Sequence, residues 1–135
     1  MATGIAQPAR LNSIVAAMRT VEANWMALSA QQRCQQIAQA ATTTLQSLFV
    51  PVPTLQVANL GADLNGQFDF GPWMLKINSN LAIGDVRHSA NQRKEVIAKL
   101  GDVIAHESRH CEQWWRMIKL VVADMVNMHS GVQHW

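Results

Sequence analysis

The apolar positions in the first third of the chain recur every three or four residues, the spacing of an amphipathic helix. One such series comprises Leu11, Val15, Met18, Val21, Trp25 and Met26. Ser29 and Gln32 then stand at the spacing of a capping box, so a second helix is expected to begin there. Its apolar face comprises Cys34, Ile37, Ala41, Leu45 and Leu48. This helix should stop at residues 50–53, because Pro51 and Pro53 lack an amide donor and restrict the residue before them.

Beyond these prolines the apolar positions alternate with a period of two, which favours β-strands. The alternating segments are residues 55–60, 67–70 and 73–78. Gly71 and Pro72 form a turn between the last two segments, so these should pair as a hairpin. The pattern predicts a small antiparallel sheet of about three strands.

The last third returns to helical spacing. Ser89 and Gln92 offer another capping box, and no proline or glycine interrupts the chain between Gly101 and Gly131. The apolar stripe that follows comprises Ile97, Leu100, Ile104, Cys111, Trp115, Ile118, Val122 and Met125. The sequence leaves two alternatives for the end of this helix. Either one helix covers residues 90–127, which is long for a small domain, or the helix breaks after about Lys119.

The order of these segments predicts an α+β fold class, with N-terminal helices, the small sheet and a long C-terminal helix. A length of 135 residues fits one domain, residues 1–135, and 49% hydrophobic residues exclude intrinsic disorder. No apolar run is long enough to span a membrane, and the first ten residues lack the pattern of a secretory signal. We therefore expect a soluble chain, cytoplasmic in its producer or exported by a signal-independent route.

Charge and cysteine content narrow the possible partners. Eleven basic and nine acidic residues give a net charge of +2, too small an excess to indicate binding to nucleic acid or a membrane surface. Cys34 and Cys111 both fall among apolar helical positions, so they are expected to be buried free thiols.

The predicted long helix contains His106-Glu107-Ser108-Arg109-His110, an H-E-x-x-H motif. With five histidines and four glutamates in the chain, about 0.005 matches would arise by chance. Residues four apart on a helix project from one face, so both imidazoles can bind one tetrahedral Zn²⁺. Glu107 is near enough to take a proton from a zinc-activated water as that water attacks a carbonyl.

On this motif and the order of its elements, the sequence resembles the zincin metallopeptidases. The resemblance implies a zinc-dependent hydrolase of peptide or amide bonds, with an edge strand that binds extended substrate. Residues 73–78 are the candidate substrate strand. Residues 104–113 also resemble the small H-E-x-x-H domains of bacterial toxins and interbacterial effectors. That resemblance implies a protein or cell-wall peptide substrate and an inhibitory immunity protein as partner.

A third metal ligand is not evident from the motif, because Gln113 stands where metzincins have a glycine. His129 is the favoured candidate, since its separation from His110 is like that of the glutamate ligand in gluzincins. Asp124 is the second candidate and His134 the third. Asp124 could reach the metal only if the helix broke and the chain returned, since it lies about 21 Å along the helix from His110.

Two further features keep another interpretation open. The chain has no tyrosine, which many zincins use to stabilise the oxyanion; His88, Arg109, His134 or Asn78 could take that role. Without a clear third ligand, the alternative is a non-catalytic interaction module whose metal is structural or whose motif is coincidental.

Overall fold

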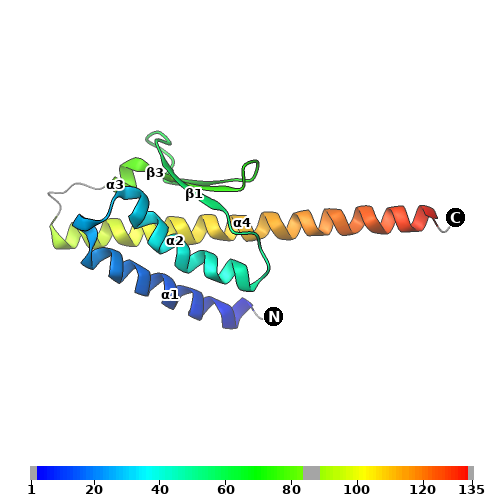
Figure 1. Ribbon diagram of the computed structural model, residues 1–135, viewed down its shortest axis with the longest axis horizontal. Coiled ribbons are helices and arrows are strands. Elements are labelled where there is room, and N and C mark those ends of the chain that lie inside the picture. Colours follow the sequence, from blue (N-terminus) through cyan, green and yellow to red (C-terminus); the bar gives the residue numbers. More distant parts are fainter. Residues whose placement is uncertain (1–2, 84–88, 134–135) are drawn as a thin grey trace.

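A computed structural model describes residues 3–83 and 89–133, with side chains placed for residues 12–82 and 89–127. The elements in chain order are α1 (Thr3–Ala23), a 3₁₀ turn η1 (Trp25–Ala27), α2 (Ala30–Ser47), β1 (Thr54–Ala58), β2 (Gly66–Asp69), β3 (Met74–Asn78), α3 (Ser79–Ile83) and α4 (Ala90–Gln133). Helices α1 and α2 lie beside the first half of α4, and the sheet covers another side of that half (Figure 1). The α+β class and the predicted order of elements are confirmed.

Both capping boxes are present. The Ser29 hydroxyl accepts a hydrogen bond from the Gln32 amide, while the Gln32 side chain accepts one from the Ser29 amide. Ser89 and Gln92 exchange the same pair of bonds at the start of α4. Each box satisfies two amide groups that the first turn of a helix leaves without partners.

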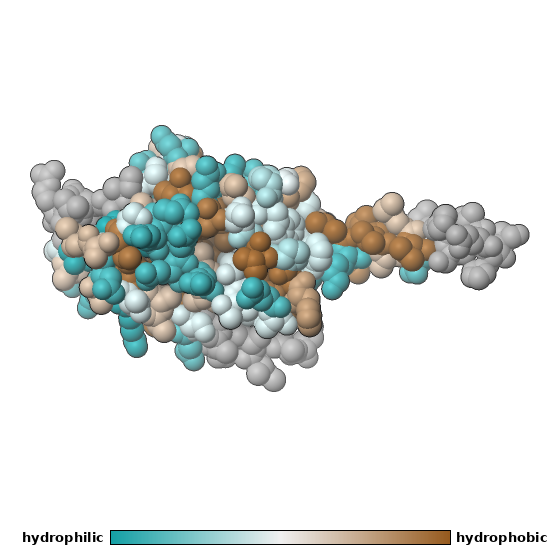
Figure 2. Space-filling view, viewed as in Figure 1, coloured by the Kyte–Doolittle hydropathy of each residue, from teal (hydrophilic) through white to brown (hydrophobic). Residues whose placement is uncertain are grey.

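Helix α4 continues as one helix to Gln133, so no break follows Lys119. Its last part projects beyond the rest of the molecule, and Figure 2 shows apolar side chains along this projection. Its exposed large apolar residues are Met117, Leu120, Val121, Val122, Met125 and Val126. Helix continues there because each added residue gains one backbone hydrogen bond and no proline intervenes.

The sheet is mixed, not antiparallel throughout, and its strand order is β1-β3-β2. The predicted hairpin of β2 and β3 is confirmed, but β1 pairs parallel to β3. The central strand is the most buried of the three, with Leu75, Ile77 and Asn78 all inaccessible to solvent. The most buried strand, β3, therefore lies in the centre of the sheet, and β1 and β2 form its two edges.

The outer edge of β1 is occupied by a side chain of α2. The Gln31 amide donates to the Leu55 carbonyl and accepts from the Val57 amide, both at 3.1 Å. One glutamine thus makes the two bonds that a neighbouring strand would make, which joins α2 to the sheet and covers this edge.

A buried arginine ties the turns at one end of the fold together. The Arg33 guanidinium lies 3.7 Å from the centre of the Trp25 ring, donates to the Trp25 carbonyl and also donates to the Ala82 carbonyl. Burial lowers the pKa of Arg33 below its ordinary value. These contacts hold η1 and α3 against α2.

The core contains both cysteines as free thiols, as predicted. Cys34 lies among the side chains shared by α1, α2 and α4, and Cys111 lies under the sheet. Burial raises the pKa of each thiol to about 12. Within the described ranges, no helix has both the length and the apolar character needed to cross a membrane.

Candidate metal centre

The two histidines of the motif converge on one point beside α4. His106 and His110 are one helical turn apart, and their Nε2 atoms are separated by 2.9 Å. The rings meet nearly at right angles, with centroids 4.5 Å apart. Together with a carboxylate oxygen of Glu107, the ligand atoms all lie within 4.8 Å of one another. The three residues are therefore placed as a group that could hold a metal ion.

The chemistry of these donors fits a transition-metal ion. Two nitrogens that bind one tetrahedral zinc at about 2.0–2.1 Å are themselves about 3.3 Å apart, close to the observed separation. The Glu107 carboxylate is only 7% exposed and has its Oε1 atom 4.0 Å from His110 Nε2. Its Oε2 atom is buried without a hydrogen-bond partner. A buried carboxylate oxygen without a partner is costly, so this atom fits a place where a bound ion or water supplies one.

Strand β2 lies directly against the motif. A Cβ atom added at Gly66 would be 2.5 Å from Val103 Cγ1 and 3.5 Å from Glu107 Cγ. Only a residue without a side chain lets the strand approach the helix this closely. Glycine at this position therefore brings the edge strand over Glu107.

The histidines project from the helix to one side of Glu107. His110 follows Glu107 by three residues, which places it about 60° around the helix axis from Glu107, and His106 lies about 40° further. His106 is exposed and the His110 side chain is 44% exposed. With Arg109 and Gln113 they line a shallow hollow of about 280 Å³. The ligand face is thus open to solvent, whereas the carboxylate is covered by the strand.

Aromatic side chains surround the turn between β2 and β3, next to the C-terminal side of the motif. Phe70 stacks on Trp114, with centroids 4.4 Å apart and planes 14° from parallel. Trp73 makes edge contacts with Phe68 and Trp115, and its indole donates to the Pro51 carbonyl. The alternation of residues 67–70 predicts a strand there but does not single out Phe70 as a site residue. The sequence does give one indication of this pair, because Trp114 follows His110 by one helical turn.

Residues 73–78 cannot serve as the substrate strand, because β3 is central and pairs on both edges. The edge strand that adjoins the motif is β2. The prediction failed because the order of strands in a sheet is not encoded in their alternation.

Asn78 also has a different role from the one considered. Its side-chain amide donates to the carbonyls of Gly61 and Leu64, and its Oδ1 atom accepts from the Asn80 amide. Asn78 therefore ties the loop after β1 to the end of β3.

The remaining ligand candidates lie in or beyond the projecting part of α4. Asp124 is exposed, and because the helix does not break it stays about 21 Å along the axis from His110. The structure therefore does not bring Asp124 to the histidines. Position 129 belongs to the same helix, about 28 Å from His110. The side chain of His129 and all of His88 and His134 lie outside the described residues, so these assignments stay predictions.

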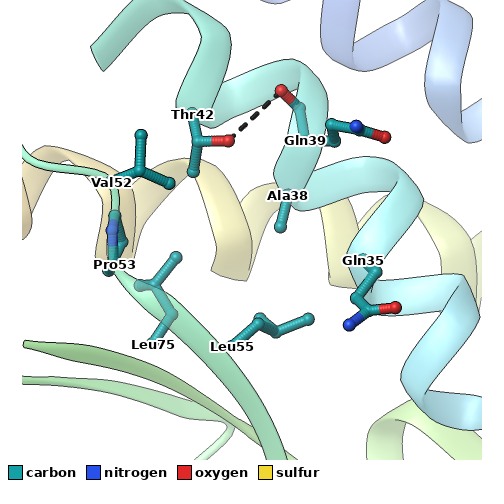
Figure 3. A pocket seen from close by; sticks show the side chains of 8 residues that line it. All are labelled: Gln35, Ala38, Gln39, Thr42, Val52, Pro53, Leu55 and Leu75. Carbon is teal, nitrogen blue, oxygen red and sulfur yellow. Dashed lines mark hydrogen bonds between the residues drawn. The ribbon is translucent and has the colours of Figure 1, made fainter. Parts of the chain in front are cut away.

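A second hollow of about 310 Å³ opens between α2 and the start of β1 (Figure 3). Its lining residues are Gln35, Ala38, Gln39, Thr42, Val52, Pro53, Leu55 and Leu75. They form an apolar floor with an amide and hydroxyl rim, and none of them titrates. Acid–base or metal chemistry is therefore assigned to the group on α4.

No protein-family model matches the chain, and comparisons with curated proteins and with solved structures likewise return no match.

Proposed function

We propose that this protein is a zinc-dependent hydrolase of peptide or amide bonds, built as a zincin-like domain over residues 1–135. The observation that carries the proposal is the convergence of the two imidazoles beside a buried carboxylate with an unpartnered oxygen. His106 and His110 would bind the metal, and Glu107 would be the general base.

The geometry suits these roles. Zinc, when bound, supplies a Lewis acid that polarises the substrate carbonyl and makes water acidic enough to react at neutral pH. Strand β2 covers Glu107 and holds its carboxylate near His110. From there the carboxylate would accept a proton from the attacking water and return it to the leaving nitrogen.

Strand β2 also offers a place for substrate. It is an edge strand that begins against Glu107, and among the described residues no strand pairs with its outer edge. An extended peptide can add to such an edge by main-chain hydrogen bonds. We therefore propose β2, in place of β3, as the strand that binds a protein or a cell-wall peptide. An inhibitory protein that blocks this edge would be the corresponding partner.

His129 stays the predicted third ligand only on the condition that α4 breaks when metal binds, because the unbroken helix holds position 129 about 28 Å from His110. Metal content per chain, measured by elemental mass spectrometry, tests the ligand set. We expect close to one zinc in the wild type and in Glu107→Gln, and strong loss in His110→Ala. Loss in His129→Ala as well would support the third ligand, and unchanged zinc there would exclude it.

Hydrolysis is tested with the same proteins on casein and on purified cell-wall sacculi. Zinc-loaded wild type should cleave at least one substrate, and Glu107→Gln should bind zinc without cleaving. Zinc-loaded wild type that cleaves neither substrate would refute the hydrolase.

Because the described donor group has only three members, we keep a second candidate, a non-catalytic module whose metal is structural or whose motif is coincidental. A structural zinc site is closed by four protein ligands, whereas a catalytic one keeps a position for water. Substitution of zinc by cobalt distinguishes them, because the visible spectrum of cobalt responds to added small anions only when a position is open.

A further inference from the structure

Phe70 and Trp114 form a flat aromatic surface at one end of the edge strand. Their rings are stacked face to face, yet Phe70 remains 55% exposed. Trp114 is half-buried and so forms the lower layer of the pair. An aromatic ring with one face packed and much of its surface in water is available for contact with another apolar group.

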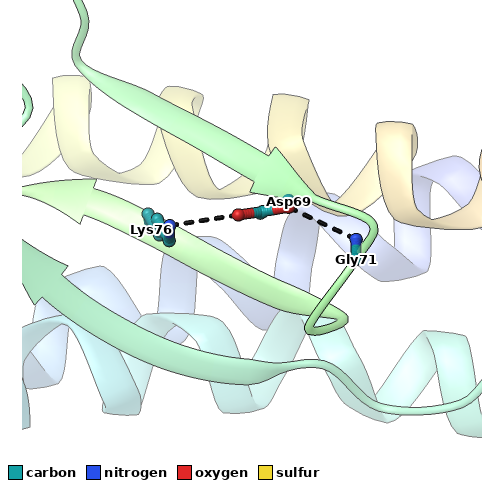
Figure 4. Close-up of polar contacts among 3 residues, drawn as sticks. All are labelled: Asp69, Gly71 and Lys76. Carbon is teal, nitrogen blue, oxygen red and sulfur yellow. Dashed lines mark hydrogen bonds and ion pairs between the residues drawn. The ribbon is translucent and has the colours of Figure 1, made fainter.

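The turn that carries Phe70 is held in place by its neighbours (Figure 4). One oxygen of Asp69 accepts from the Gly71 amide at 3.3 Å, and the other forms an ion pair with Lys76 at 3.1 Å. On the other side, Trp73 has a positive φ of 55° and its ring packs between Phe68 and Trp115. The exposed ring is therefore presented by a fixed turn.

The surface lies at a defined distance from the candidate metal centre. Trp114 follows Glu107 by seven residues, which is about 10.5 Å along α4 and about 20° around it. Strand β2 begins against Glu107 at Gly66, and the residue after its end, Phe70, lies on Trp114. The strand thus runs along the helix from the carboxylate to the aromatic pair. Gly66 and Phe70 are four residues apart, so a peptide paired with β2 also covers this distance in about four residues.

The direction of a bound peptide follows from strand pairing. Antiparallel pairing is slightly more stable per residue than parallel pairing. A peptide that pairs antiparallel to β2 passes Phe70 and Trp114 first and Glu107 afterwards. Its residues near the aromatic pair therefore precede the bond at the metal centre.

We propose that Phe70 and Trp114 bind an aromatic or large aliphatic side chain about four residues before the cleaved bond. This specificity rests on the proposed hydrolase function and names the class of peptide it accepts. Both rings are uncharged, and the nearby Asp69 carboxylate is already paired with Lys76. Apolar contact is therefore the interaction that this surface offers.

The test is cleavage of a proteome-derived peptide library by the zinc-loaded protein, with each cut mapped by mass spectrometry. We expect aromatic residues, leucine and methionine to be enriched at the fourth position before the bond. The enrichment should vanish in Phe70→Ser and in Trp114→Ala. The matched control is Phe49→Ser, which removes a phenylalanine that is 86% exposed at the end of α2 and should keep the enrichment.

Binding gives a second readout that does not need turnover. A fluorescein-labelled peptide taken from a preferred cut should bind the zinc-loaded Glu107→Gln protein. Alanine at the fourth position should weaken that binding about tenfold, the loss expected for one large apolar contact. Adding Phe70→Ser to Glu107→Gln should reduce the difference to less than about threefold. The exposed position of Phe70 keeps this variant informative if Trp114→Ala does not fold.

Each result decides the proposal. Cleavage without enrichment at that position, or enrichment that survives in both variants, would overturn it while leaving the hydrolase intact. Enrichment about four residues after the bond would show parallel pairing and overturn the stated direction. No cleavage by zinc-loaded wild type would instead overturn the hydrolase itself, and the specificity with it.

Discussion

Replacing Gly66 by alanine places a methyl group in the contact between β2 and α4. The new carbon would lie 2.5 Å from Val103 Cγ1, about 1 Å closer than atoms in ordinary contact, and 3.2 Å from the Lys76 carbonyl oxygen. A valine in a helix has one strongly preferred side-chain conformation, so Val103 cannot turn aside at little cost. Either β2 must shift away from α4, or α4 must shift away from β2.

The size of the effect follows from two opposing contributions. Overpacking of one methyl group costs about 1–3 kcal/mol of unfolding free energy. Alanine restricts the unfolded chain more than glycine does, which returns about 0.5–1 kcal/mol. We therefore expect Gly66→Ala to destabilise the protein by about 0–2.5 kcal/mol. With Val103→Ala already present, the clash is gone and Gly66→Ala should be close to neutral.

A double-mutant cycle measures this directly. The four proteins are unfolded in urea and followed by tryptophan fluorescence, with m-values compared to confirm that the same surface is exposed. The double variant should be more stable than the sum of the two single effects by at least about 1 kcal/mol. If the two effects add within about 0.5 kcal/mol, the proposed contact between β2 and α4 at this position is wrong. That result would also contradict the conclusion that β2 lies over Glu107.

Two further predictions concern the interior and the other edge of the sheet. Gln31→Ala removes two hydrogen bonds to β1 and should destabilise the protein by about 1–3 kcal/mol. Hydrogen exchange of the β1 amides should become faster, and an unchanged exchange rate would contradict the contact between Gln31 and β1. Cys34 and Cys111 should react slowly with a thiol reagent at pH 8 in the folded protein and rapidly in urea, because burial raises the pKa of each to about 12. The fold favours the neutral thiols, so their contribution to stability is present below the ordinary pKa of 9.0 and is lost as pH rises toward 12. In the double variant Cys34→Ser/Cys111→Ser, the free energy of unfolding should therefore change less with pH in that range.

Local rules were sufficient for much of the fold. The capping boxes at Ser29 and Ser89, the end of α2 before the prolines and the hairpin of β2 and β3 each depend on residues near in sequence. The same holds for the convergence of His106 and His110, because helical periodicity alone puts residues four apart on one face. Burial of both cysteines followed from their apolar helical neighbours.

Sequence therefore determined the elements, their class and the three donors of the candidate site. Tertiary structure decided which strand became central, that β1 runs parallel to β3, that Gln31 covers one edge, and that Phe70 lies on Trp114. It also left α4 unbroken, so that Asp124 stays far from the histidines. Helix periodicity and capping act within a few residues, whereas strand order and cross-chain contacts are set by which surfaces bury each other. Those surfaces belong to segments far apart in the chain, and no spacing within one segment specifies them.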